Sequence, residues 1–250
     1  MLRTLWFCAT AVGVTLWHGG RVLVAALARV PYTPRGFYDR EQVAWGRRLL
    51  RLNGGRLRVE GLERLDPSGS YVFVANHASL VDIWALLAAI PHSVKFLAKR
   101  ELLAWPVFGR VLRAAGHLPI DRGDLRHASA AYDEAAAKIR RGTSAAVFAE
   151  GTRSRTGELL PFKRGPFVLA LRAGVPVVPV WIGGTHRMLP RGSLRPRAGE
   201  VVVRVADPIP TVGLRHEDRE RLCREAEAAV GRLGGAGEGR REKGEGAHRT

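Results

Sequence analysis

The sequence predicts a single α/β domain with a mixed sheet flanked by helices, preceded by an N-terminal membrane-associating helical segment. Beyond residue 56, short apolar runs alternate with helical stretches, which is the pattern of a sheet covered by helices. The 250 residues are 46% hydrophobic, which is enough for one large core. These values exclude a wholly disordered chain and a multi-span membrane protein.

Seven apolar runs are expected as strands, at 57–59, 71–75, 94–98, 117–120, 145–149, 177–182 and 201–205. Six stretches are expected as helices, at 37–52, 82–89, 101–115, 127–140, 166–173 and 217–233. The last twenty residues include seven Gly and eight charges, a composition typical of disorder. The expected organisation is a membrane-anchoring helical segment at 1–30, one domain at 31–230 and a disordered tail at 231–250.

The N-terminal segment is apolar at 4–17 and 22–28, with His18-Gly19-Gly20-Arg21 between the two pieces. A spanning helix needs roughly 20 mostly apolar residues, so neither piece spans alone. Two arrangements fit: one poor membrane span, or a two-helix hairpin lying in one leaflet with Trp6 and Trp17 near the headgroups.

A cleaved signal peptide is the alternative for this segment, because Arg3 precedes an apolar stretch and residues 25–28 resemble a cleavage site. However, Arg21 breaks the stretch before that site. Through residue 58 there are ten Arg and two acidic residues, a net +8 beside the apolar segment. Basic side chains next to an apolar anchor are attracted to anionic lipid. The segment therefore predicts a protein that lies on a membrane.

The whole chain carries 40 Lys and Arg against 23 Asp and Glu, a formal net charge of +17. Such a charge favours a polyanionic partner: nucleic acid, an anionic membrane surface or a phosphate-bearing substrate. Its two cysteines, Cys8 and Cys223, exclude a disulfide framework, and no Cys/His cluster has zinc-ligand spacing. Both thiols are expected to be reduced, on the cytosolic side.

Four short stretches lie at the ends of predicted strands, where α/β proteins place their sites. The first runs from Asn76 to Asp82. If His77 lies on the turn after the strand and Asp82 in the first helical turn, the carboxylate holds one imidazole nitrogen as N–H. The other nitrogen is then free to take a proton from a substrate hydroxyl. The alternative is a capping box over 79–82, with Asp82 serving backbone amides and His77 a polar loop residue.

The second stretch, 116–123, includes Asp121-Arg122-Gly123, which either directs Arg122 at a phosphate or forms a surface turn with a local ion pair. In the third, 148–155, Gly151 lets backbone N–H groups approach an anion, Thr152 adds a donor and Arg153 can fork onto phosphate oxygens. The alternative there is a Gly turn with solvated charges. No GxxxxGK[ST] sequence is present, so ATP or GTP chemistry has no support.

The fourth stretch, Val-Pro-Val-Val-Pro-Val at 175–180, is expected as an edge or irregular strand, because proline removes ladder donors. It either lines an acyl groove or is a strand of the core, and the core strand is the default expectation. In this order, the Asn-His-x-x-x-x-Asp, Gly-x-x-x-Ile-Asp-Arg, Glu-Gly-Thr-Arg and Val-Pro-Val-Val-Pro-Val stretches resemble the four blocks of the glycerolipid acyltransferase family. Within that family, they are most similar to the 1-acylglycerol-3-phosphate acyltransferases. The resemblance covers roughly residues 60–210 and extends to the N-terminal anchor. The second stretch departs from the family pattern at Pro119, where the family has an aromatic residue. This difference affects the expected shape of the acceptor pocket.

The resemblance implies direct acyl transfer without a covalent acyl-enzyme. In it, His77 is the general base, oriented by Asp82, that deprotonates the free hydroxyl of a lysophospholipid. The alkoxide attacks a fatty acyl thioester, acyl-CoA or acyl carrier protein, and gives phosphatidic acid and a free thiol. The resemblance also assigns acceptor-binding residues, namely Glu150, Gly151, Thr152 and Arg153, with Lys99 and Arg122 as candidates for the phosphate.

It further implies no cofactor beyond the acyl thioester co-substrate, no metal, no nucleic acid, and a place at the cytoplasmic face of the cell membrane. Two other classes of protein fit these residues less well. A serine hydrolase lacks its GxSxG sequence here. A basic nucleic-acid-binding or membrane-scaffold protein accounts for the charge but not for His77, Asp82 and Arg153 at strand ends. Within the family, another lysophospholipid or membrane lipid is the alternative acceptor.

Overall fold

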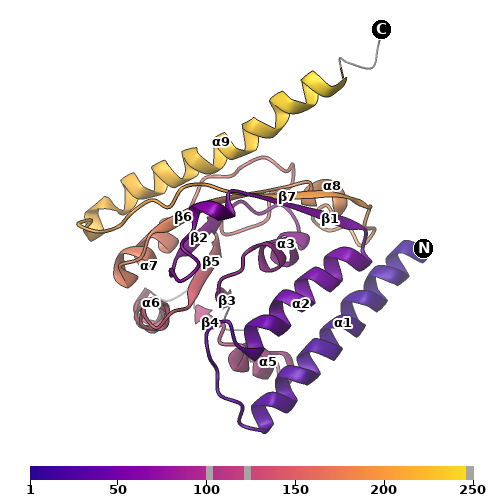
Figure 1. Cartoon of the computed structure of the whole chain (residues 1–250), viewed down its shortest axis with the longest axis horizontal. Helices are drawn as coiled ribbons and strands as arrows, with labels where there is room; N and C mark the ends of the chain where they lie inside the picture. The colour runs from indigo at the N-terminus through magenta and orange to yellow at the C-terminus, as the bar shows by residue number, and fades with distance from the viewer. Residues whose placement is uncertain (100–103, 121–124, 246–250) are drawn as a thin grey trace.

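The computed structural model describes residues 1–99, 104–120 and 125–245 (Figure 1). Its strands are β1 (Gly55–Glu60), β2 (Val72–Ala75), β3 (Val94–Lys99), β4 (Leu118–Ile120), β5 (Ser144–Phe148), β6 (Val177–Gly183) and β7 (Gly199–Val205). Its α-helices are α1 (Leu2–Leu27), α2 (Phe37–Leu52), α3 (Val81–Ala89), α5 (Phe108–Ala114), α6 (Leu125–Arg140), α7 (Gly165–Ala173), α8 (Thr185–Met188) and α9 (Arg219–Glu245). Two 3₁₀ turns lie at Leu62–Arg64 and His216–Asp218.

The strands form one mixed sheet in the order β1-β7-β6-β2-β5-β3-β4, which confirms the predicted fold class. Strands β6, β2, β5, β3 and β4 are parallel, and only the β6–β7 pairing is antiparallel. The carboxyl ends of β2 to β6 therefore share one edge. In open α/β sheets this edge is where ligands bind.

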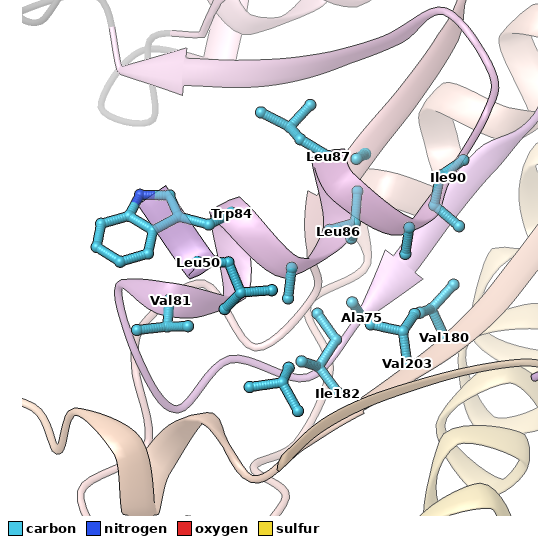
Figure 2. Close-up of a cluster of buried hydrophobic side chains, with 14 of the residues drawn as sticks. Leu50, Ala75, Val81, Trp84, Leu86, Leu87, Ile90, Val180, Ile182 and Val203 are labelled. Atoms are coloured by element: carbon cyan, nitrogen blue, oxygen red, sulfur yellow. The ribbon is translucent and has the colours of Figure 1, made fainter. Parts of the chain in front are cut away.

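Each face of the sheet has its own helical cover. Side chains alternate along β2: Phe73 and Ala75 point into a core with α1, α2 and α3, whereas Val72 and Val74 point into a core with α6, α7 and α9. This period of two is what a doubly covered strand requires. Figure 2 shows Leu50 of α2, side chains of α3 and side chains of the sheet, such as Ile182, in one core. The sheet edge is thus held by a rigid scaffold on both sides.

A buried ion pair joins α2 to the sheet. Lys95 of β3 is 1% exposed, pairs with Asp39 of α2 and donates to the carbonyl of Ala115 at 2.6 Å. The Lys95 ammonium also lies 4.7 Å from the ring centroid of Tyr32. Desolvation lowers the pKa of Lys95, opposed by the Asp39 charge. Because a buried charge without its partner is strongly unfavourable, this pair fixes α2 on the domain.

Helix α1 corrects the prediction for the N-terminus. The Gly19-Gly20 pair was expected to interrupt the segment, but α1 is one helix of 26 residues that packs along α2. Two glycines cost about 2 kcal/mol of helix propensity, and tertiary contacts offset this. Gly19 faces Val111 of α5, and Arg21 bonds Glu41 of α2. The helical pair is therefore α1 with α2, and no hairpin forms within 4–28.

All seven predicted strands and the helix at 37–52 are present, but two other segments differ from prediction. Among the described residues of the helix expected at 101–115, only α5 is helical. Residues 104–107 form turns around Pro106. The proline ring disfavours helix at Pro106 and at the residue before it. Helix α9 continues to Glu245, where a disordered tail was expected from Gly231. Arg204 of β7 donates from Nη1 to the Leu233 carbonyl at 2.8 Å, and this contact holds α9 on the domain beyond Gly231.

Strand β6 confirms the core strand expected at 175–180 and excludes the edge position. It lies between β2 and β7 and is not an edge strand. Pro179 is tolerated because its missing N–H faces the end of the β7 ladder. There the carbonyl of Pro179 accepts from Ala206 N–H at 3.0 Å, beyond the Val180–Val205 pair. Proline is thus accommodated where the ladder needs only an acceptor.

Candidate active site

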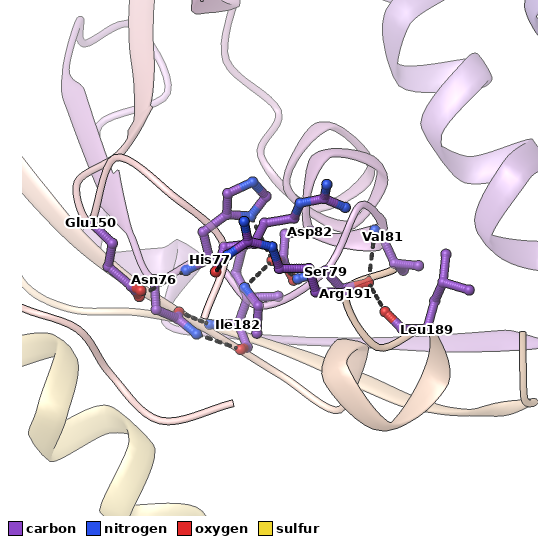
Figure 3. Close-up of polar contacts among 11 residues, drawn as sticks. Asn76, His77, Ser79, Val81, Asp82, Glu150, Ile182, Leu189 and Arg191 are labelled. Carbon is purple, nitrogen blue, oxygen red and sulfur yellow. Dashed lines mark hydrogen bonds and ion pairs between the residues drawn. The ribbon is translucent and has the colours of Figure 1, made fainter. Parts of the chain in front are cut away.

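The first and third stretches meet at the carboxyl edge of the sheet. Asn76 and His77 follow β2, and Glu150 follows β5, its parallel neighbour. The Asn76 amide ties the turn to β6: its Oδ1 accepts from Ile182 N–H at 2.7 Å, and its Nδ2 donates to the Ile182 carbonyl at 2.9 Å (Figure 3). Three adjacent strands therefore fix where the His77 turn begins.

His77 and Asp82 are in direct contact. His77 Nδ1 lies 2.8 Å from Asp82 Oδ2, and the Asp82 side chain is fully buried in the first turn of α3. A carboxylate can only accept, so Nδ1 carries the proton and Nε2 is left with a lone pair. The His77 side chain is 14% exposed. This geometry is what a histidine that takes a proton from a bound hydroxyl requires.

The capping interpretation is present in the same structure. Asp82 Oδ2 also accepts from the backbone N–H of Ala78 at 2.7 Å and of Ser79 at 2.8 Å. Ser79 Oγ accepts from Val81 N–H at 3.1 Å and donates to the Leu189 carbonyl at 2.7 Å. One carboxylate oxygen thus both binds the backbone amides that precede α3 and holds the imidazole, so the two alternatives from sequence are one arrangement.

Glu150 supports the turn from the opposite side. Its Oε1 accepts from His77 N–H at 2.9 Å, and the residue is 2% exposed. Burial raises the pKa of the Glu150 carboxyl to about 7, with the Asp82 charge adding to the rise. Hydrogen bonds from the backbone N–H groups of His77 and Leu160 oppose it. Glu150 therefore holds the backbone of His77 in place and does not contact the imidazole ring through this bond.

Glu150 predicts a pH-dependent stability. A carboxyl whose pKa is raised by folding destabilises the folded state as pH rises from about 4.5 to about 7. Replacing it by Gln keeps a carbonyl acceptor for His77 N–H and removes the titration. Glu150→Gln should therefore gain about 3 kcal/mol of unfolding free energy over wild type between pH 4.5 and pH 8. Urea unfolding at both pH values measures this; an equal difference at both would contradict it.

The loop after β5 is anchored to the same turn. Ser154 N–H donates to the His77 carbonyl at 2.7 Å, and Gly151 adopts a φ of +75°, where a side chain would be strained. Arg191, from the loop after α8, donates from Nη1 to the Arg153 carbonyl at 2.8 Å. Neither Arg153 nor Arg191 has an ion-pair partner among the described residues. The loop therefore carries uncompensated positive charge beside His77.

The structure brings together six predicted site residues: His77, Asp82, Glu150, Gly151, Thr152 and Arg153. Lys99 ends β3 at the same edge, but its side chain, like the whole of Arg122, lies outside the described residues. Sequence reasoning missed two contributors. Arg191 lies 38 positions beyond Arg153 and had no local signal. Phe148, which stacks on His77, is the first residue of the 148–155 stretch, but it was assigned no role from the sequence.

A histidine held by a buried carboxylate at the carboxyl ends of parallel strands is an arrangement that α/β enzymes can use for proton transfer. Residues 56–183, more than half of the chain, match the family model described as Acyltransferase. The chain belongs to the acyltransferase family, and it is an acyltransferase.

Known relatives agree with this assignment. The chain is 33% identical to a human 1-acyl-sn-glycerol-3-phosphate acyltransferase alpha, over 87% of this chain and 80% of the relative. It is 38% identical to a Cocos nucifera 1-acyl-sn-glycerol-3-phosphate acyltransferase over 66% of this chain, but spans only 54% of that relative's length. The crystal structure of the 1-acyl-sn-glycerophosphate acyltransferase PlsC from Thermotoga maritima superposes with a TM-score of 0.76 at 30% identity, covering 93% and 95% of the two chains.

Proposed function

We propose that this protein transfers a fatty acyl group from an acyl thioester to the free hydroxyl of 1-acylglycerol-3-phosphate and so forms phosphatidic acid for phospholipid synthesis. The observation that carries the mechanism is the His77–Asp82 contact at 2.8 Å, with Nε2 on the unbonded side of the ring. The names of the human and Thermotoga maritima relatives support the choice of acceptor.

In the proposed reaction, Nε2 of His77 takes the hydroxyl proton of the acceptor as its oxygen attacks the thioester carbonyl. The C–S bond then breaks, the acyl C–O bond remains, and the proton moves from the imidazolium to the leaving thiolate. Asp82 keeps Nδ1 protonated and stabilises the imidazolium. The reaction yields phosphatidic acid and a free thiol, with the donor either acyl-CoA or acyl carrier protein.

A phosphate-bearing acceptor fits the charge around this site. Arg153 and Arg191 are joined through the Arg153 carbonyl, and Lys163 approaches the same loop, its side chain lying 3.4 Å from where a Cβ on Gly151 would be. A phosphomonoester carries nearly two negative charges and binds most strongly to converging cations. We assign Gly151, Thr152 and Arg153 to the acceptor, with Lys99 and Arg122 as further candidates for its phosphate. Glu150 orders this loop against His77.

An acceptor panel tests the proposal. Labelled acyl-CoA or acyl carrier protein is supplied in detergent micelles with 1-acylglycerol-3-phosphate, with other lysophospholipids, or with monoacylglycerol, which lacks the phosphate. We expect label in phosphatidic acid and at least tenfold less transfer to monoacylglycerol, because ionic hydrogen bonds to the phosphate are lost. Label found only in another lipid would mean that the acceptor is that lysophospholipid and not 1-acylglycerol-3-phosphate. No transfer from either donor by folded protein would overturn the proposal.

We also propose that α1 holds the protein at the cytoplasmic face of the cell membrane. It is the one helix in the described part of the chain that is long and apolar enough to cross a membrane. Its side toward α2 is buried, while its outer side exposes large apolar residues, namely Leu2, Leu5, Trp6, Val12, Leu16, Trp17, Val24 and Leu27. Since α1 packs along α2 of the domain, lying in one leaflet suits it better than spanning.

Leu16→Glu tests this membrane attachment. The Leu16 side chain is 66% exposed on the outer side of α1, so the substitution leaves the contact with α2 intact. Losing one leucine from an apolar interface costs about 1.5–3 kcal/mol, so binding to vesicles with anionic lipid should weaken at least about tenfold. The matched control is Val212→Glu, which is 88% exposed outside α1 and should bind as wild type does. Equal binding by both variants would contradict the α1 surface.

A further inference from the structure

The ring of Phe148 lies face to face with the imidazole of His77. The two ring centroids are 3.9 Å apart and the planes differ by 10°. Phe148 ends β5 directly across from Ala75, which ends β2, and His77 follows Ala75 by two residues. The ends of two neighbouring parallel strands therefore set this stack, and no flexible loop intervenes on the Phe148 side.

Two further rings continue the stack, one on β3 and one directly before β4. Phe96 of β3 stacks on Phe148 with centroids 5.7 Å apart and planes 19° apart, and His117 stacks on Phe96. His117 Nδ1 accepts from Phe96 N–H at 3.1 Å, and burial together with the Lys95 charge lowers the pKa of His117 to about 3. His117 is thus neutral near pH 7, and its uncharged ring closes the buried end of the column.

We infer that Phe148 is a positioning residue for the proposed general base, fixing the plane of the His77 ring and stabilising the imidazolium that forms during acyl transfer. Asp82 contacts the ring in its plane, at Nδ1, whereas Phe148 contacts its face, so the two residues restrain different rotations. A cation over an aromatic face is attracted by the ring quadrupole, and neutral imidazole gains less. The stack therefore stabilises the protonated form selectively. This inference rests on the proposed function.

Other charges around His77 must be separated from this effect. Asp82 faces the ring from α3, Glu150 binds the His77 backbone from the loop after β5, and Arg153 and Arg191 carry positive charge beside the turn. The Glu150 carboxyl, whose pKa is about 7, titrates in the same range. Variants of Phe148 and Phe96 leave all of these charged groups in place. The charged groups therefore contribute equally to the pH dependence of both variants, and this contribution cancels when the two variants are compared.

The test is the pH dependence of kcat/KM for acyl transfer in wild type, Phe148→Leu, Phe148→Tyr and Phe96→Leu, with thermal unfolding of each. Loss of the stack should lower kcat of Phe148→Leu about tenfold and move the acid limb down by about 0.5–1 pH unit. The KM for the acceptor should stay within about twofold. Phe148→Tyr keeps a ring and should restore both quantities. Phe148→Met serves in place of Leu if the Leu variant does not fold.

Phe96→Leu is the matched control, because it removes a ring of equal size from the same column without touching His77. It should keep the acid limb of wild type. If Phe148→Leu and Phe96→Leu lose the same activity and neither moves the limb, the inference is overturned, because Phe148 then only fills space. An inactive wild type would instead overturn the proposed function, so the two failures are distinguishable.

Discussion

His77→Gln is expected to lower kcat by about 10²–10⁴-fold, the usual contribution of a general base. The KM values for donor and acceptor should change only a few-fold, because the proposed function gives His77 the proton and gives the phosphate to the Arg153 loop. Glutamine is chosen over alanine because its amide can still donate to the buried Asp82 carboxylate. Steady-state transfer to 1-acylglycerol-3-phosphate measures both constants.

Two outcomes would contradict the role of His77 as general base. If His77→Gln keeps more than about a tenth of the wild-type kcat while its unfolding midpoint is unchanged, then the imidazole is not the base. A large rise in KM with unchanged kcat would instead make His77 a binding residue.

Two substitutions of Asp82 are expected to distinguish its role in holding the backbone turn from its role in stabilising the imidazolium. Asp82→Ala removes the acceptor of His77 Nδ1 and of the N–H groups of Ala78 and Ser79. Each buried donor left unpaired costs about 1–3 kcal/mol, so this variant should lose activity and several kcal/mol of stability. Asp82→Asn keeps an acceptor for the amides but loses the charge that stabilises the imidazolium. It should lose about 10²–10⁴-fold in kcat with a smaller loss of stability.

Denaturant unfolding and transfer rates of the two variants check this separation. Equal losses of stability in Asp82→Ala and Asp82→Asn would mean that the charge, and not the hydrogen bonds, stabilises the turn. Full activity in Asp82→Asn would leave only the capping role for Asp82.

Local chemistry explains what could be predicted from the sequence. The apolar runs between helical stretches located every strand of the described residues, because the length and composition of a run are properties of a short segment. The contact of His77 with Asp82 was predictable because both lie at one strand-to-helix turn. Spacing left open whether Asp82 caps the helix or holds the ring. The structure shows Oδ2 doing both.

Long-range contacts explain what could not be predicted. The glycines of α1 favoured a break, but packing of Gly19 on α5 and the Arg21–Glu41 bond keep the helix intact. Strand order decides that β5 adjoins β2, and only that order places Phe148 over His77. The Arg191–Arg153 bond likewise joins residues that are separate in sequence. Such contacts leave no local pattern to recognise.

The central claim is direct acyl transfer by a histidine base, and the most direct measurement follows thiol release and acyl label together. Wild type is given labelled acyl-CoA first without, then with, 1-acylglycerol-3-phosphate. We predict no label on the protein and no burst of thiol before the acceptor is added. Afterwards, one thiol should be released for each labelled phosphatidic acid. Thiol release without acceptor, with label retained on the protein, would contradict direct transfer, and absence of labelled phosphatidic acid would contradict the proposed reaction.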